Sequence, residues 1–501
     1  MLKNFIPDEV RQICAKLEEA GFEAYLVGGC VRDVLLDKKP KDWDVATNAR
    51  PEEVLKIFPD SVYENEFGTV LVKVKADVPD PGSATGMADS SIRTVEITTY
   101  RIEGKYTDKR RPDEVRFAKT IEEDLSRRDF TVNALALRSS GAGEVAGAIL
   151  DPFGGQDDLK KKIIRTVGDP EKRFDEDALR LMRAVRFAVQ LDFEIEAKTW
   201  AAIQKHARGL EIIAKERIRD ELTKILLTPN AAKGILMLEE LGLLKYILPE
   251  LQEGIGVGQN LHHIYTVFEH NVRALDYTAK QQYDLPIRMA ALLHDVGKPR
   301  AKQGEGYHST FYQHEYIGAK MAVKALDRLR FPREFTEKVA HLVRRHMFYY
   351  NVGDVSPAGV RRLLVRIGPE HVDDLLKVRE ADRIGSGVAK AVPYKLRHLL
   401  FMMDKVKRDP LSPKMLKING DDIMELLGLP PGMRIGWILH SLLEEVLDDP
   451  EKNEREHLIR RTRELDALSD DELKELTLKA KQKEKEAEEA AEQEIRKKHR
   501  V

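Results

Sequence analysis

Apolar and polar positions follow two different periods along this chain. Residues 24–137 alternate short apolar runs with helical stretches, and the runs at 67–74 and 94–100 show the alternation of strands. Pro51 opens a predicted helix, because proline fits the first helical turn. Helical periodicity dominates from Arg173 onward. The pattern predicts an α/β head, a small mixed sheet with helices, followed by a mostly α-helical remainder.

Composition limits the number of domains and the cellular compartment to expect, but it does not indicate a chemical activity. The chain has 501 residues, enough for about three to four domains. Its formal net charge is -2, so a nucleic-acid partner needs a local basic surface. Cys14 and Cys30 lack the spacing of a metal site, which favours a reduced, cytoplasmic setting. No apolar run reaches the length of a membrane span, so we expect neither membrane insertion nor secretion.

The candidate chemistry begins in one early stretch, LVGGCVRDVLLDKKPKDWDVAT. Asp42 and Asp44 occupy alternate positions of a predicted strand, which would place two carboxylates side by side. Like charges at that distance need a cation, and two hard carboxylates suit Mg²⁺ carrying a phosphate-rich substrate. Gly28 and Gly29 let backbone amides approach phosphates, and Arg32 adds a positive charge. The local interpretation is nucleotidyl transfer.

This stretch resembles the motif of the nucleotidyltransferase superfamily, in the class II branch that contains bacterial tRNA CCA-adding enzymes and poly(A) polymerases. A second segment, RRDFTVNA, resembles another motif of that family. The resemblance implies that Arg128, Asp129 and Asn133 contact the sugar and triphosphate of the incoming nucleotide. Composition alone makes residues 101–125 a solvated loop. By resemblance the same residues match a flexible segment of enzymes that add the terminal A, which counts against a CC-only enzyme.

A third motif, EDALR, puts Asp177 and Arg180 three residues apart, hence on one face of a predicted helix. By itself this is an ordinary surface ion pair. The resemblance implies a protein template that reads the incoming base. A carboxylate accepts hydrogen bonds and a guanidinium donates them, which suits cytosine and adenine and rejects uracil and guanine. The later segment ERIRDEL, around Arg217, is expected to orient this template through charge pairs.

A second catalytic candidate lies in the middle of the chain. The order of one histidine, a His-Asp pair and a distant aspartate resembles the HD phosphohydrolase superfamily, whose ligands converge on a divalent or transition metal. Two further histidines stand where binuclear members carry additional ligands. The implied ligands are His270, His294, Asp295 and Asp382, with His314 and His346 as candidates for the additional positions. Hydrolysis by a metal-activated water would be the mechanism.

A basic region follows the proposed HD domain. Residues 383–417 contain nine Lys and Arg against two Asp, which favours contact with an RNA backbone over a merely solvated helix face. The ING and GLPPG segments after it resemble the C-terminal part of bacterial tRNA nucleotidyltransferases, which is associated with tRNA binding. Residues 77–91 are an insertion to which we assign no chemistry, and the tail from Ser469 is expected to be an exposed charged helix.

Together these motifs predict a tRNA nucleotidyltransferase that adds C and A from CTP and ATP to the tRNA 3′ end with Mg²⁺. The alternatives are A-only addition or poly(A) synthesis, an HD phosphohydrolase as the main activity, and an RNA-binding or structural protein with two inactive domains. The sequence does not fix the oligomeric state. The expected parts are a head over 1–140, a neck with the nucleotide-selecting motif over 141–250, an HD domain over 251–385, a tRNA-binding region over 386–468 and a charged tail over 469–501.

Overall fold

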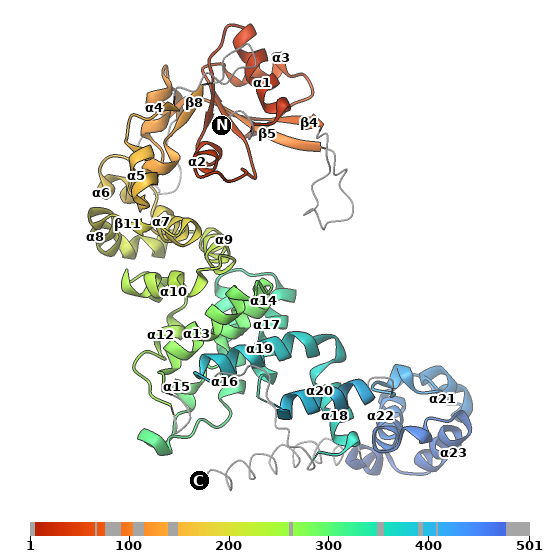
Figure 1. The fold of residues 1–501 in the computed structure, drawn as a ribbon. Helices are drawn as coiled ribbons and strands as arrows, with labels where there is room; N and C mark the ends of the chain where they lie inside the picture. Colours follow the sequence, from red (N-terminus) through yellow and green to blue (C-terminus); the bar gives the residue numbers. More distant parts are fainter. Residues whose placement is uncertain are drawn as a thin grey trace. The chain divides into compact units, whose positions relative to one another are not determined.

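The structure is a computed structural model, and it describes residues 6–65, 68–75, 92–103, 115–138, 149–259, 264–347, 355–388, 394–406 and 409–476. The chain divides into two compact units, Met1–Pro249 with Arg328–Arg330 and Glu250–Asp327 with Phe331–Val501 (Figure 1). The insertion at 77–91, residues 104–114 and most of the charged tail lie outside the described residues. The described residues within 101–125 include two strands and a helix, so the expectation of a solvated loop is wrong for them. The five-part division is finer than this split and stays a prediction.

The first unit contains a seven-stranded sheet whose described strands follow the order β3-β4-β5-β2-β1-β8-β9. Only β2 and β5 are paired in parallel among these neighbours. Leu26, Val45 and Ile97 of the central strands are buried, as their apolar alternation predicts. The strands are β1 Ala24–Val27, β2 Asp44–Thr47, β3 Val62–Asn65, β4 Thr69–Lys75, β5 Ile92–Thr99, β8 Ala136–Arg138 and β9 Ile149–Leu150. The helices of the head are α1 Asp8–Glu19, α2 Gly29–Leu35, α3 Pro51–Ile57 and α4 Ile121–Ser126, and a separate hairpin pairs β6 Arg101–Glu103 with β7 Val115–Phe117.

The join between β1 and β2 positions the candidate chemistry of the head. The two strands are antiparallel and Leu26 pairs with Val45, so the end of β1 meets the start of β2. The prediction that both aspartates lie within the second strand is wrong. Asp44 is the first residue of β2, and Asp42 lies in a bend before it. Hydrogen bonding to the neighbouring strand β5 extends one residue before β2, because Glu96 N donates to Trp43 O at 3.2 Å.

The predicted helical remainder begins in the same unit. Helices α7 and α9 pack together, and a short parallel pair joins β10 Ile163–Ile164 to β11 Glu194–Ile195. The prediction that Asp177 and Arg180 share a helix face is wrong, because α6 ends at Glu176 and α7 begins at Leu179. The helices are α5 Gly155–Lys161, α6 Pro170–Glu176, α7 Leu179–Leu191, α8 Ala197–His206, α9 Lys215–Leu226, α10 Ala231–Glu240 and α11 Leu244–Ile247. Helix α12, Pro249–Gln252, begins at the last residue of this segment and continues into the second unit.

The second unit is helical over its described residues. Its first core forms where α13 packs against α14 and α19, and α14 also packs against α17. A second group of helices follows, in which α18 contacts both α20 and α22. No helix in the described ranges is long and apolar enough to cross a membrane. The main helices are α13 Val267–Lys280, α14 Leu285–Leu293, α15 Lys298–Ala301, α16 His314–Arg328, α17 Arg333–Arg345, α18 Pro357–Ile367, α19 Val372–Gly385, α20 Tyr394–Val406, α21 Gly420–Leu427, α22 Met433–Asp448 and α23 Arg455–Asp466.

Candidate active sites

Gly28 forms the turn from β1 into α2. Its φ of 75° and ψ of -133° are unfavourable for any residue with a Cβ. A Cβ placed there would lie 2.7 Å from Nη1 of Arg128 and 3.7 Å from Oδ2 of Asp44. The missing side chain therefore leaves room beside the turn for the Arg128 guanidinium, with the Asp44 carboxylate close by.

Asp42 and Asp44 carry the negative charge of this site. Asp42 is exposed, whereas Asp44 is partly buried. Burial raises the pKa of Asp44, the positive charge of Arg128 lowers it, and the negative charge of Asp42 raises it again. A divalent cation would relieve both the burial cost and the repulsion. The oxygen donors and their unequal exposure thus fit Mg²⁺, which keeps part of its water shell.

Arg128 is held in place by Asp124 of α4. Nη2 of Arg128 lies 3.3 Å from Oδ2 of Asp124, and Arg127 binds the other oxygen at 2.7 Å. Burial opposes the charge of Asp124, but the two arginines lower its pKa overall. The carboxylate is therefore ionised at neutral pH and fixes Arg128 next to Gly28.

A chain of polar side chains connects α2 to α7. Arg32 donates from Nη1 to Oδ1 of Asn133 at 2.7 Å, and Asn133 donates from Nδ2 to Oδ1 of Asp129 at 3.3 Å. Arg183 of α7 donates from Nε to Oδ2 of Asp129 at 2.7 Å. Burial opposes the charged form of Asp129, yet Arg183 lowers its pKa overall. The structure thus brings three predicted nucleotide-binding residues together and adds Arg183, which the sequence did not single out.

Asp177 and Arg180 lie on either side of the junction between α6 and α7, where Arg180 N donates to Asp177 O at 3.0 Å. Their side chains have separate partners. Arg217 of α9 donates from Nη2 to Oδ2 of Asp177 at 2.7 Å, and Arg180 binds Glu176 and the carbonyl of Arg173. The charge pair expected of the segment around Arg217 is present, and its role in orienting the template stays a prediction.

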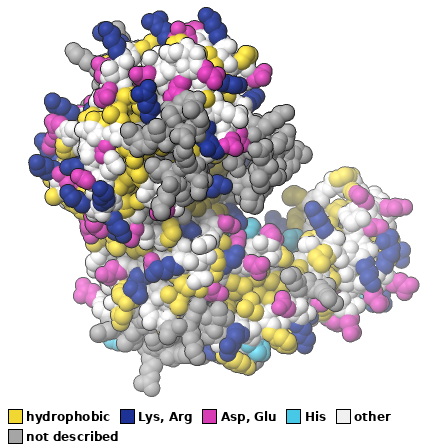
Figure 2. Space-filling model, turned by 45° about the horizontal axis from the view of Figure 1, so that its top comes forward, with side chains coloured by type: hydrophobic (Ala, Val, Ile, Leu, Met, Phe, Trp, Pro, Cys, Tyr) yellow, Lys and Arg dark blue, Asp and Glu magenta, His cyan; other side chains and the backbone are white. Residues whose placement is uncertain are grey.

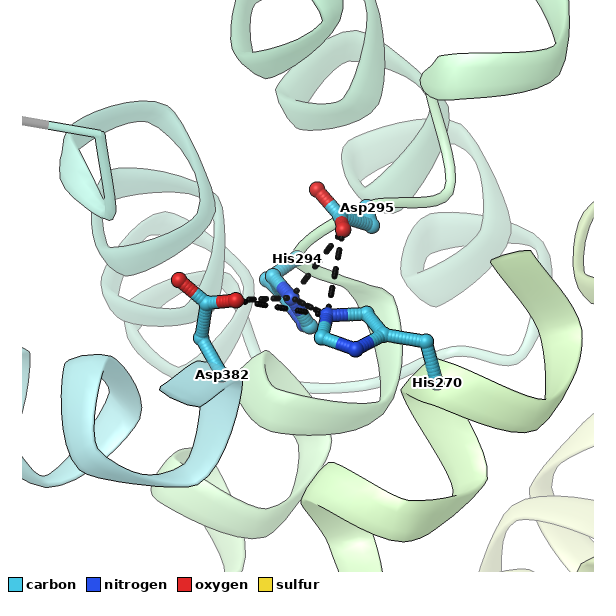
Figure 3. Close-up of side chains that lie close together, drawn as sticks. All are labelled: His270, His294, Asp295 and Asp382. Atoms are coloured by element: carbon cyan, nitrogen blue, oxygen red, sulfur yellow. Dashed lines mark hydrogen bonds and ion pairs between the residues drawn. The ribbon is translucent and has the colours of Figure 1, made fainter. Parts of the chain in front are cut away.

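The second unit contains a buried cluster of histidines and aspartates (Figure 3). His270 of α13, His294 after α14 and Asp382 of α19 converge with Asp295. Nε2 of His270 lies 2.9 Å from Nε2 of His294, 3.2 Å from Oδ2 of Asp295 and 3.3 Å from Oδ1 of Asp382. The four ligands implied by the resemblance therefore lie together.

Asp295 also belongs to a second group. Its Oδ1 lies 3.2 Å from Nε2 of His314 and 3.5 Å from Nε2 of His346, and these two nitrogens are 3.3 Å apart. Oδ2 of the same carboxylate faces the first group and is 2.5 Å from the ammonium of Lys298. One carboxylate shared between two histidine pairs is the arrangement of a bridging ligand.

The outer partners of the histidines fit metal binding. Nδ1 of His294, His314 and His346 lies 2.7–2.8 Å from a backbone carbonyl three residues earlier in the chain. Each bond places a proton on Nδ1, so that in the neutral imidazole Nε2, the atom that faces the cluster, is the lone-pair donor for a metal. A mixed set of imidazole and carboxylate donors suits first-row transition metals.

The charges within the cluster are strongly coupled. Burial disfavours an imidazolium, but Asp295 and Asp382 raise the pKa of His294 to about 10, whereas burial lowers the pKa of His346 to about 4. Both aspartate pKa values lie well below the usual range, with burial opposing the charged form and Lys298, Arg379 and the histidines favouring it. The two carboxylates are therefore anionic and attract a cation.

Helix α20 carries three of the described basic residues of the predicted basic region. Its inner face holds the buried residues Leu396 and Leu399. Its outer face exposes Lys395, Arg397 and Lys405. On the face drawn in Figure 2, Lys and Arg are interspersed with Asp and Glu. This agrees with the near-zero net charge and leaves local surfaces such as α20 to provide basic character.

Three family descriptions match successive parts of the chain. The poly(A) polymerase head domain matches residues 24–165, the probable RNA and SrmB-binding site of polymerase A matches 192–255, and the HD domain matches 267–384. With the aspartate pair and the buried cluster, these matches define a nucleotidyltransferase that carries an HD domain.

Relatives that match nearly the whole chain identify the family more closely than the matches to single domains. The chain is 36% identical over 434 residues to the A-adding tRNA nucleotidyltransferase of Deinococcus radiodurans, covering 84% of this chain and 91% of that protein. It is 33% identical over 459 residues to the CCA-adding enzyme of Enterococcus faecalis, covering 91% and 96%. The chain belongs to the class II family of CCA-adding enzymes and poly(A) polymerases, and it is a tRNA nucleotidyltransferase of the CCA-adding family.

Solved structures support the same fold. The Bacillus stearothermophilus CCA-adding enzyme in complex with CTP superposes with a TM-score of 0.64 at 29% identity, covering 91% of this chain and 96% of that chain. The Thermotoga maritima CCA-adding enzyme complexed with tRNA gives a TM-score of 0.53 at 22% identity, covering 93% and 97%, and shows the fold alone. The predicted fold class, family and enzyme activity are confirmed. The choice between CCA and A-only addition is not made by these likenesses.

Proposed function

We propose that this protein adds both C and A, from CTP and ATP, to build the complete CCA end of tRNA. The observation that carries nucleotidyl transfer is that the Arg128 guanidinium and the Asp44 carboxylate both lie beside the Gly28 turn. Full CCA addition is supported by the CCA-adding relatives from Enterococcus and Lactococcus, each matched over 90% or more of this chain. Extension of a tRNA transcript that lacks CCA tests the proposal.

The residues of the head divide the work of the transfer. Asp42 and Asp44 would hold two Mg²⁺ ions, which when bound activate the tRNA 3′-hydroxyl and neutralise the pyrophosphate. Arg128 and Arg32 donate hydrogen bonds and charge to the phosphates beside the open backbone of Gly28 and Gly29. These positive groups are already held by protein partners, so little reorganisation is needed on binding.

Asp177 and Arg180 are proposed to select the base. Asp177 accepts a hydrogen bond from the amino group of cytosine or adenine, and Arg180 donates to a ring nitrogen or carbonyl. Uracil and guanine would present a carbonyl oxygen to Asp177, which leaves two acceptors facing each other. Since the two side chains have separate partners, Arg217 and Glu176, each can adjust to a new base independently.

Arg180→Ala is expected to lower the preference for CTP and ATP over UTP and GTP by about tenfold to a hundredfold, because it removes a directional donor. Steady-state incorporation of the four nucleotides measures this preference. Arg208→Ala, at an exposed arginine paired with Glu211, is the control and should leave it unchanged. An Arg180→Ala enzyme with the original preference would refute the base-reading role.

The basic face of α20 is proposed to bind tRNA. Changing Lys395, Arg397 and Lys405 together to alanine is expected to weaken tRNA affinity about tenfold or more and to reduce the salt slope of binding by about one per lost phosphate contact. Binding is measured at several salt concentrations. Removing three exposed lysines of the head, Lys56, Lys73 and Lys119, is the charge-matched control. Equal losses in the two variants would contradict a specific role for α20.

A second candidate activity is phosphohydrolysis at the HD cluster. It is favoured by the position of Asp295 between two histidine pairs. We infer that His270, His294 and Asp382 hold one metal ion, that His314 and His346 hold a second, and that Asp295 serves both. Metals bound there would supply an activated water for attack on a terminal or cyclic phosphate. Release of phosphate, or opening of a cyclic phosphate, by the Mn²⁺- or Ni²⁺-loaded protein tests this activity.

A further inference from the structure

The outward face of α20 carries a line of aromatic rings. Tyr394, His398 and Phe401 follow one another at spacings of four and three residues, which places them on one face of the helix. We refer to these three residues as the aromatic stripe. The helix packs against α18, and its buried positions lie opposite the stripe. The buried side chains are Leu396, Leu399, Met403 and Val406.

The rings of the aromatic stripe are unusually exposed. Tyr394 and Phe401 are each 63% exposed, whereas no other described Phe, Tyr or Trp exceeds 44%. The ring centroid of His398 lies 6.1 Å from that of Tyr394 and 6.3 Å from that of Phe401. A ring left in water gives up the free energy that burial would bring. A continuous exposed line of rings therefore indicates a surface that a partner covers.

Positive side chains flank the aromatic stripe. Arg397 lies three residues after Tyr394 and four before Phe401, and Lys405 lies four residues after Phe401. Both cations are exposed and lie next to the rings on the helix surface. The helix has one acidic residue, Asp404, so positive charge is in excess around the stripe. The partner is therefore expected to be anionic as well as flat.

Unpaired nucleotides have this combination of properties. A base that is not paired can stack on an aromatic ring, while the phosphates beside it bind Arg and Lys. A base within a duplex has both faces covered by its neighbours and cannot use the rings in this way. An apolar protein partner fits less well, because this face has two cations and no aliphatic side chain between Tyr394 and Lys405.

We propose that the aromatic stripe stacks on unpaired bases of the bound RNA, while Arg397 and Lys405 hold the phosphates beside them. This inference rests on the proposed role of α20 in tRNA binding and adds base contacts to the phosphate contacts. Stacking tolerates any base, because every base has a flat face. The stripe therefore recognises loop or end nucleotides by their lack of pairing and not by their sequence.

The salt dependence of binding separates stacking from charge. Full-length protein with Tyr394→Ala and Phe401→Ala together is expected to bind tRNA about tenfold more weakly. The slope of log affinity against log salt should stay unchanged, because no phosphate contact is lost. Phe401→Leu keeps an apolar side chain without a flat ring and should also weaken binding, by about fivefold, whereas Phe401→Trp should not. The control is Tyr63→Ala, which removes an exposed ring of the head.

The indole introduced by Phe401→Trp also reports stacking directly. Its emission, taken as the difference from the unchanged protein, should be quenched by tRNA and by an unstructured oligoribonucleotide. A blunt RNA duplex with the same number of phosphates should not quench it. Equal quenching by the duplex would overturn the proposal, because paired bases cannot reach the ring.

The remaining outcomes distinguish the proposal from its rivals. Unchanged affinity in the double alanine variant, or an equal loss in Tyr63→Ala, would overturn it. Full tRNA affinity in Phe401→Leu, together with self-association that Phe401→Ala abolishes, would assign the stripe to a second copy of the chain. If the triple variant of the basic residues weakens binding and the ring variants do not, stacking alone fails. If neither set weakens binding beyond its control, the proposed tRNA contact of α20 fails as well.

Discussion

Asp44→Asn is expected to reduce nucleotide addition by about a thousandfold or more while leaving tRNA affinity within about twofold. The amide matches the carboxylate in shape but cannot supply the negative charge that draws Mg²⁺ to the turn. Asp42→Ala should likewise abolish addition. Single-turnover addition of CTP to tRNA gives the rate, and a direct binding assay gives the affinity.

Stability separates loss of chemistry from loss of fold in this test. Burial raises the pKa of Asp44, so its ionised form costs folding free energy at neutral pH. Asp44→Asn should therefore melt at or above the temperature of the unchanged protein. Asp37→Asn is the control, because Asp37 is exposed just beyond α2 and its φ of 54° is one that asparagine tolerates. Substantial turnover by Asp44→Asn would remove the basis of the proposed head chemistry.

Asp295→Asn is expected to lower the amount of transition metal bound at the HD cluster about tenfold or more and to abolish any phosphohydrolysis. The reason is that Asp295 contributes an oxygen to both histidine groups, whereas an amide is a much weaker ligand. Metal analysis after dialysis measures occupancy. Nucleotide addition, measured in parallel, reports that the head remains folded.

Two further variants sharpen the HD test. Asp382 belongs to the first histidine group alone, so Asp382→Asn should remove about half of the metal that the unchanged protein retains. Asp295→Asn also leaves the buried Lys298 without its carboxylate, so a second version with Lys298→Met controls for that unpaired charge. Full metal retention by both Asp295 variants would exclude a bridging role.

Features set by local sequence could be predicted. The alternation of apolar residues gave β4 and β5, and Pro51 marked the start of α3, because each depends on a few neighbouring residues. The six HD residues were also found in advance, since their order along the chain resembles a known superfamily. Their sharing of Asp295 could not be predicted, because it depends on which carboxylate oxygen faces each histidine pair.

Features set by distant contacts were missed. The sequence around Asp177 has the pattern of one continuous helix. In the structure the Asp177 carboxylate accepts hydrogen bonds from the backbone N of Leu179 and from Arg217, which lies 40 residues later in the chain. This bond from a side chain to the backbone two residues later competes with a continuous helix, and α7 begins at Leu179. Arg183 was missed for the same reason, because its partner Asp129 lies 54 residues earlier in the chain. An arginine on an amphipathic helix gives no local sign of a partner so distant in the chain.

The central claim is that one nucleotide site builds the whole CCA end, and extension of two tRNA transcripts tests it most directly. One transcript ends before CCA and the other ends in CC, and each receives CTP and ATP separately and together. We expect the first transcript to gain two residues with CTP alone and three with both nucleotides, and the second to gain a single A. Extension of the second transcript alone would contradict the account in favour of A-only addition, and long adenosine tails would favour a poly(A) polymerase.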